Sequence, residues 1–329
     1  MRLRRTLIGA LAALLVGGLA AAPSTAQPAD TETTVAPAAG FEDQFTKHAV
    51  TVNGTYTPLV GQFCTPGYAY GFVIWYAPGP APDAMWIAEG GYELTPPFTS
   101  QPLTINGSYT PILGDFDDNG CTDIIWYSPG PGPDSVWYGE LGGGFTSKPV
   151  TLNGTYTPVV GRYFDPMNPM CVSCDGIYWY STNGGTESIW LGTSGRTFVT
   201  ATAPQVSGND YVVTSYESGG VLFYRPGKGA DSLWTQLIAN RSTPVKSIPL
   251  TIDGIYEPHW IPDRGLLLYA PGPAADRYVT DIADDGTMSI QNGAINGTYR
   301  VATAPSSAGL PIVLFHGPGT ASDSIWTDY

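Results

Sequence analysis

The sequence predicts an all-β fold built from many short strands, and its composition is the first observation that does so. Gly and Pro account for 41 and 30 of the 329 residues, which is about twice their average usage. Hydrophobic residues make up 43% of the chain and aromatic residues 12%, so the chain can bury a core, unlike a disordered segment. Frequent turns combined with a buried core favour short strands over helices.

A sixfold internal repeat is the second observation. The segment 150–161 has close copies at 50–61 and 103–114, and weaker copies begin near Val206, Ile252 and Ile295. Every copy carries a tyrosine at the same position, at spacings of 43 to 55 residues. These tyrosines are Tyr56, Tyr109, Tyr156, Tyr211, Tyr256 and Tyr299. A period of this length is typical of repeat architectures.

Two further markers follow each tyrosine. The first is a pair of aromatic or apolar residues, followed by a Pro-Gly turn in five copies and by Asn183-Gly184 in the third. The pairs are Trp75-Tyr76, Trp126-Tyr127, Trp179-Tyr180, Phe223-Tyr224, Leu268-Tyr269 and Leu314-Phe315. The second marker is an acidic residue three positions before an aromatic or apolar one. These acidic residues are Asp83, Asp134, Glu187, Asp231, Asp276 and Asp323.

Each copy predicts about four strands, and the second copy shows them most clearly. Its expected strands are 109–113, 123–127, 135–138 and 145–152, with glycine-rich or proline-rich turns between the later ones. Four strands in about 45 residues is the size of a β-propeller blade. Because one such sheet cannot bury both faces, neighbouring blades must pack around a common axis. The recurrence of tryptophans at one blade position favours packing between blades over contact with sugars.

The two ends of the repeat region predict six blades closed into a ring. The sixth copy stops at residue 329, just after its third strand. The segment 45–52 resembles 145–152, which is a fourth strand, and it stands before the first copy. It can therefore complete the last blade and remove both exposed sheet edges. A seven-bladed ring is the alternative, and it would need a further copy for which the sequence has no room.

The N-terminus predicts export from the cell. Residues 1–26 resemble a signal peptide, with arginines before an apolar run and small residues before the expected cleavage site. Its Arg4-Arg5 pair leaves general and twin-arginine export both open. Residues 27–40 read as a flexible linker, and 41–329 as the propeller. We expect a secreted monomer without a membrane span, and the net charge of −14 excludes a nucleic-acid partner.

One loop of the second copy carries the side chains of a calcium site. Oxygen-bearing side chains stand at positions one, three, five and nine (Asp115, Asp117, Asn119 and Asp123), and a glycine stands at position six. In a calcium loop of this spacing, position seven offers its backbone carbonyl, which here belongs to Cys121. An EF-hand would add a glutamate at position twelve and flanking helices, whereas Trp126 stands there inside an expected strand. The alternative is a polar turn that binds no ion.

With this loop between its first two strands, the chain resembles the FG-GAP repeat family, also called VCBS repeats, as in the integrin α-subunit propeller. The resemblance covers about residues 45–329 and implies propeller blades with a calcium loop of this kind. The other copies depart from the pattern: the first lacks carboxylates at 61–66, the third has Asp165 and Asp175 at the wrong spacing, and the last three have shortened loops. The resemblance therefore implies Ca²⁺ in the second copy, and whether other blades bind it stays open.

The four cysteines predict disulfides, because their number is even and the chain carries an export signal. They fall in the same inter-strand loop of copies one, two and three. Three pairings are open, and we expect Cys64–Cys121 with Cys171–Cys174 first. A zinc site lacks further ligands with a motif, and a redox Cys-x-x-Cys lacks its βαβ setting.

Two classes of function remain. The first is a secreted binding or scaffold module that recognises an extracellular carbohydrate, cell-wall polymer or protein. The alternative is a glycan hydrolase or lyase that uses acidic residues at the propeller channel. The sequence has no serine-hydrolase, zinc-protease, phosphate-binding or dinucleotide motif, so we assign no catalytic residue. Propeller folds host both classes, and fold alone does not separate them.

Overall fold

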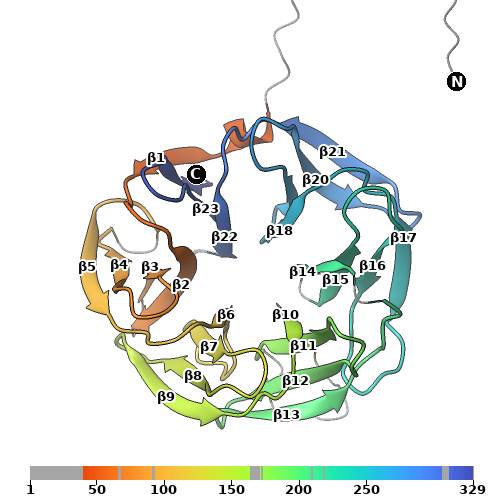
Figure 1. The fold of residues 1–329 in the computed structure, drawn as a ribbon, viewed down its shortest axis with the longest axis horizontal. Helices are drawn as coiled ribbons and strands as arrows, with labels where there is room; N and C mark the ends of the chain where they lie inside the picture. The colour runs from red at the N-terminus through yellow and green to blue at the C-terminus, as the bar shows by residue number, and fades with distance from the viewer. Residues whose placement is uncertain are drawn as a thin grey trace, which may run out of the picture. The chain divides into compact units, whose positions relative to one another are not determined.

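The computed structural model describes residues 40–65, 68–90, 93–163, 171, 173–208, 210–217, 219–305 and 311–328. Six four-stranded antiparallel sheets form a ring (Figure 1), so the predicted all-β propeller and its six blades are confirmed. Within these residues the helical element is η1 (Phe41–Gln44), a 3-10 turn. None of the described helical residues forms a helix long and apolar enough to cross a membrane. The predicted signal peptide (1–26), the linker up to residue 39 and Asp165 lie outside the described residues.

Strands of the first three blades follow one another from the centre of the ring outward. Blade 1 contains β2 (Thr57–Thr65), β3 (Tyr68–Tyr76), β4 (Asp83–Ala88) and β5 (Phe98–Leu103); blade 2 contains β6 (Thr110–Gly114), β7 (Asp123–Tyr127), β8 (Asp134–Gly139) and β9 (Phe145–Val150); blade 3 contains β10 (Tyr156–Gly161), β11 (Gly176–Ser181), β12 (Ser188–Thr193) and β13 (Thr197–Thr202).

The last three blades repeat this order, except that the outer strand of blade 6 comes from the N-terminal side. Blade 4 contains β14 (Val212–Tyr216), β15 (Gly220–Tyr224), β16 (Asp231–Thr235) and β17 (Lys246–Leu250); blade 5 contains β18 (Glu257–Ile261), β19 (Gly265–Tyr269), β20 (Asp276–Ile282) and β21 (Met288–Gly293); blade 6 contains β22 (Arg300–Pro305), β23 (Pro311–His316), β24 (Asp323–Thr327) and β1 (Thr46–Val50).

The ring closes as the sequence predicts. β1 pairs antiparallel with β24 from Thr46 opposite Thr327 to Val50 opposite Asp323. Figure 1 shows β1, at the start of the colour scale, beside the last strands of the chain. The closure supplies the fourth strand that the sixth copy lacks, so β24 is not left as an exposed edge.

The core lies between blades, because each buried cluster draws its residues from two neighbours. Between blades 1 and 2, Ile74 and Tyr76 share a cluster with Ile124 and Trp126, and each is at most 1% exposed. The ring centroids of Tyr76 and Trp126 are 5.2 Å apart. The repeated tryptophans on the second strands therefore pack between blades, as the repeat indicates.

Alternation of strand direction gives the ring two different faces. We call one the tyrosine face: it carries the turns between second and third strands and the connections from each blade to the next. Its loops meet in glycine bridges, such as Gly130 with Gly154. We call the other the cysteine face: it carries the loops between first and second strands, including 115–123, and those between third and fourth strands.

The repeat markers hold the tyrosine face together. The Tyr127 hydroxyl donates to the Gly154 carbonyl (2.8 Å) and accepts from the Tyr156 N–H of the next blade (3.0 Å). The buried Asp134 carboxylate accepts from the N–H groups of Ser128 (2.7 Å) and Leu152 (2.9 Å). The same carboxylate contacts recur at Asp83, Asp231 and Asp276. Each of these four aspartates thus ties one blade to the start of the next.

One marker prediction was wrong by a residue. In blade 6, Asp323 accepts from the Gly317 N–H, as Asp83 accepts from the Ala77 N–H in blade 1. The matching pair is therefore Phe315-His316, and not Leu314-Phe315. The apolar run Pro311–His316 hid the shift, because a histidine replaces the tyrosine that marks the five other blades.

Candidate metal centre

The acidic loop 115–123 lies where the sequence predicts, between β6 and β7, the first two strands of blade 2. Its turn needs two left-handed residues, Asp118 (φ 60°) and Gly120 (φ 80°). The Asp115 carboxylate stabilises the turn by accepting from the N–H groups of Asn119 (3.2 Å) and Gly120 (2.9 Å). Asp118 is exposed.

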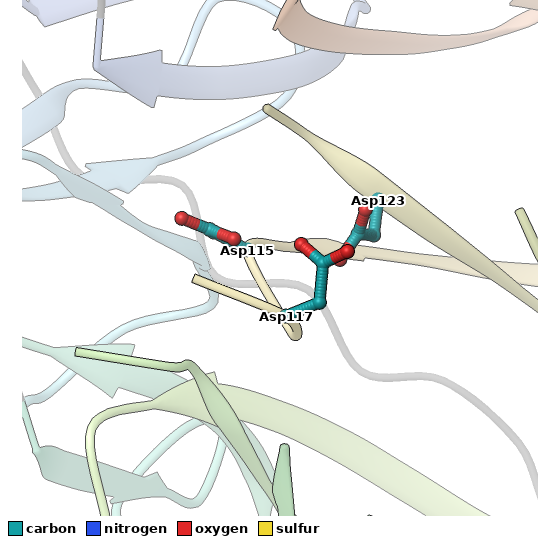
Figure 2. A group of neighbouring side chains, drawn as sticks. All are labelled: Asp115, Asp117 and Asp123. Atoms are coloured by element: carbon teal, nitrogen blue, oxygen red, sulfur yellow. The ribbon is translucent and has the colours of Figure 1, made fainter. Parts of the chain in front are cut away.

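Three carboxylates gather at this loop. Asp115, Asp117 and Asp123 each place an oxygen within 4.8 Å of the others. Figure 2 shows Asp117 and Asp123 pointing toward each other, with Asp115 to their side. Asp123 is fully buried and Asp117 is 6% exposed. Carboxylate oxygens are the ligands that Ca²⁺ prefers, so these three side chains fit that ion by their chemistry.

The electrostatics of the cluster favour a cation. Burial, with repulsion from Asp117 and Asp115, raises the pKa of Asp123 to about 8. Burial, with repulsion from Asp175 and Asp117, raises the pKa of Asp115 to about 6. Hydrogen bonds from backbone N–H groups oppose both shifts: those from Phe116 and Gly139 reach Asp123 at 2.8 and 2.9 Å. The raised pKa values mean that the charged forms of these carboxylates are disfavoured. A nearby positive charge would favour them.

Arg196 of blade 3 supplies one positive charge to the cluster. Its Nε donates to Asp117 (2.7 Å), and its terminal nitrogens donate to both oxygens of Glu140 (2.6 and 3.1 Å). This pairing lowers the pKa of Glu140 to about 2. Arg196 stands in the β12–β13 hairpin at φ 59°. The sequence interpretation missed Arg196 and Glu140, because neither belongs to the loop motif. The signal that could have pointed to Arg196 is a basic residue in the hairpin between the third and fourth strands of the next blade.

The side chain of Asn119, one of the five predicted ligands, makes hydrogen bonds within and beside the loop. Asn119 donates to Asp117 (3.3 Å) and to the Gly139 carbonyl (2.8 Å), and its side-chain oxygen accepts from the Cys121 N–H (2.7 Å). That oxygen therefore stabilises the loop. The structure brings together the three aspartates, whereas Asn119 and the Cys121 carbonyl remain predicted ligands.

The disulfides follow the pairing expected first. Cys64 is bonded to Cys121, which joins the first two blades, and Cys171 is bonded to Cys174 within blade 3. Disulfides persist in oxidising compartments. The Cys64–Cys121 bond also anchors the acidic loop to its neighbouring blade.

Fold and site together define a six-bladed β-propeller whose acidic inter-strand loop is joined to blade 1 by a disulfide and to blade 3 by an ion pair. No family model matches the chain, and no curated protein matches it. Among solved structures it is similar to a catalytically inactive virginiamycin B lyase from Staphylococcus aureus with quinupristin (11% identity, TM-score 0.42) and to the selenomethionine-substituted lyase (12%, 0.44). It is also similar to a glucose dehydrogenase (12%, 0.44). Each comparison covers 86% of this chain and 99% of the other. Similarity at this low level does not show that this chain shares those activities.

Proposed function

We propose that the chain is a secreted β-propeller that binds an extracellular glycan on its tyrosine face and carries one structural calcium ion on its cysteine face. The two disulfides support an oxidising compartment. The loop position between first and second strands supports the resemblance to FG-GAP repeats.

The repeated chemistry of the tyrosine face is the observation that carries the binding proposal. Four consecutive blade junctions present an exposed asparagine and an exposed threonine or serine beside a half-buried tyrosine. The exposed pairs are Asn296 with Thr298, Asn53 with Thr55, Asn106 with Ser108, and Asn153 with Thr155. Uncharged amides and hydroxyls beside aromatic rings suit the hydroxyl groups and apolar ring faces of sugars. Their repetition suits a polymer with repeating units.

The channel offers less support for the hydrolase or lyase alternative. Glycan hydrolysis generally needs two carboxylates flanking the scissile bond. Across the six inner strands as the structure describes them, Glu257 is the one acidic residue. We therefore propose binding as the function.

A matched pair of surface variants tests the binding face. Ser108→Glu adds a charge to the tyrosine face, and Ser194→Glu adds the same charge to an exposed hairpin of the cysteine face. The parent and each variant are applied to a glycan array and to insoluble polysaccharides. We expect binding without release of sugars, lost in Ser108→Glu and kept in Ser194→Glu. Sugar release by the parent, or equal binding by both variants, contradicts the proposal.

The calcium proposal rests on Asp115, Asp117 and Asp123. These side chains would hold the ion, and the ion would neutralise their mutual repulsion and stiffen the loop between blades 1 and 3. Calorimetric titration of Asp115→Asn and Asp118→Asn with CaCl₂ tests it, because both changes remove one charge from the same loop. We expect Asp115→Asn to abolish binding and the exposed Asp118→Asn to keep it. Absence of binding by the parent, or equal loss in both variants, contradicts the site.

A further inference from the structure

The junction that closes the ring uses a different side chain from the other junctions. In blades 1, 2, 4 and 5, a tyrosine hydroxyl accepts a hydrogen bond from the backbone N–H of the next blade's tyrosine. At the closure, the Tyr56 N–H instead faces Nε2 of His316 at 3.3 Å. The His316 ring lies against Asp323, with Nδ1 2.7 Å from the carboxylate. Neither side chain of this pair is exposed to solvent.

The hydrogen bonds around His316 define its protonation. The Tyr56 N–H can only donate, so Nε2 must offer its lone pair, and the proton of a neutral imidazole stands on Nδ1 facing Asp323. Asp323 also accepts from the Val52 N–H (2.8 Å) and the Gly317 N–H (3.0 Å). The His316–Asp323 pair thus connects the C-terminal strands to 52–56, which lead out of β1.

The groups around His316 do not provide a place for a second ring proton. Tyr56 and Trp75 present aromatic rings at 6.1 and 5.2 Å. Arg300 stands opposite His316 on β22 and donates to the Tyr56 carbonyl (2.8 Å), so the charge on that side is positive. Asp323 is the one carboxylate bonded to the ring among the described residues; a charged ring would keep this contact as an ion pair, whereas a proton on Nε2 would remove the contact to Tyr56.

We propose that His316 makes the ring closure an acid-sensitive clasp, in which protonation at Nε2 breaks the contact to Tyr56 and loosens 46–56 from blade 6. The new proton would point at the Tyr56 N–H, and the charge would be buried without solvent. Histidine is the side chain whose charge ordinarily changes between about pH 5 and pH 8, and this sets the range in which the clasp is tested. Loosening β1 exposes the edge of β24, where another strand can pair.

The other junctions lack this sensitivity, because a neutral tyrosine hydroxyl has both a proton and lone pairs. Burial raises the pKa of Tyr76, Tyr127, Tyr224 and Tyr269 above the ordinary value. These hydroxyls therefore stay neutral in acid and at neutral pH. Acid should loosen the closing junction while those four remain intact.

Hydrogen exchange read by mass spectrometry tests the clasp on the full chain. Peptides covering 46–56 are compared with peptides covering the other junctions at about pH 7.5 and about pH 5, after correction for intrinsic exchange rates. We expect the opening of 46–56 to rise about tenfold for each pH unit over which the ring takes up its proton. His316→Gln keeps a neutral donor and acceptor, and His316→Tyr copies the other blades; we expect no such rise in either.

The two other histidines of the chain supply the controls. His48 lies on β1 itself, beside the Thr327 hydroxyl (3.0 Å), so His48→Gln separates the contribution of this side chain from that of His316. Burial lowers the pKa of His259 to about 4, which keeps that ring neutral over the tested range. We expect His48→Gln to retain the full rise. Equal opening of the parent at both pH values, or a rise that survives His316→Gln, overturns the clasp.

Discussion

At the scale of single residues, the carboxyl groups of Asp115 and Asp123 would link the proposed calcium binding to pH. Their pKa values, about 6 and about 8, lie above the value near 4 of an unfolded aspartate. Between about pH 4 and pH 8 the cation-free folded protein therefore holds protons that the unfolded chain has released. Its stability falls as pH rises through this window. A cation bound at the proposed site would displace those protons and remove this loss of stability.

Stability measured with and without calcium checks this coupling. We expect the rise in Tm produced by about 1 mM CaCl₂ over EDTA to be larger at pH 8 than at pH 5, since at pH 5 protons compete for the carboxylates. For a Kd of about 10⁻⁴ to 10⁻³ M, binding adds about 0.4 to 1.4 kcal/mol. In a chain of this length that corresponds to about 0.6 to 2 °C. A shift that is the same at both pH values, or larger at pH 5, would contradict the raised pKa values.

Arg196 gives a second test of the proposed cation site, because its guanidinium pairs with Asp117. Its side chain is 25% exposed and pairs with the nearly buried Asp117, so in Arg196→Gln the carboxylates lose their positive neighbour. Without calcium we expect lower Tm in the variant, and with calcium a larger gain than in the parent, because the ion then supplies the missing charge. Arg225→Gln breaks an exposed pair with Asp210 on the tyrosine face and should leave the calcium response unchanged. The same calcium gain in parent and Arg196→Gln would show that this guanidinium has no influence on the site.

At the scale of strands and loops, the buried acidic markers connect one blade to the next. Asp134 satisfies two backbone N–H groups that burial separates from water. Glu187 of blade 3 has a longer side chain, and there Gln205 bonds the Glu187 backbone instead. The acidic side chain at the same position of the repeat therefore makes different contacts in blades 2 and 3.

This difference predicts unequal costs for the same chemical change. Asp134→Asn replaces one acceptor oxygen with a donor facing an N–H group, so we expect a loss of about 1–3 kcal/mol in the free energy of unfolding. Glu187→Gln removes a charge without breaking a described side-chain hydrogen bond, and it should cost less. Urea unfolding of both variants measures the two losses. Equal losses would mean that the two carboxylates contribute equally to the free energy of unfolding despite their different contacts.

The elements also show which features the sequence could predict. Turn glycines, repeated tyrosines and acidic markers are local signals repeated six times, so blade number, strand content and closure followed from them. The sixth marker pair was misplaced because His316 breaks the pattern inside a uniformly apolar strand. Arg196 and Glu140 meet Asp117 only after blades 2 and 3 pack together, and the orientation of Asn119 depends on its bonds to Gly139 and Cys121. Such contacts between elements have no signature in the spacing of residues.

At the scale of the whole molecule, stability depends on joining the two ends of the repeat region. Each blade buries its faces only against its neighbours, so an open ring would leave two blades half covered. The closure uses more than the β1–β24 pairing. Phe41 is 1% exposed and stacks on Tyr278 of blade 5 at 4.8 Å, and Phe45 packs on Trp326 of blade 6 at 5.9 Å.

Two truncations test whether this segment holds the ring. Residues 27–39 belong to the predicted flexible linker, so their removal should leave Tm nearly unchanged. Removing 27–52 deletes Phe41, Phe45 and β1 together. Burial of each phenylalanine contributes about 1.5–3 kcal/mol, and the loss of β1 also opens the edge of β24. From the two phenylalanines alone we expect this second protein to melt about 5–9 °C lower, by the usual relation of free energy to Tm, and the loss of β1 adds to this or makes the protein insoluble. A third truncation, removing 27–44, keeps β1 and Phe45 and should fall between the two. If all three proteins melt together, six blades are stable without N-terminal closure, and the outer strand of blade 6 is dispensable.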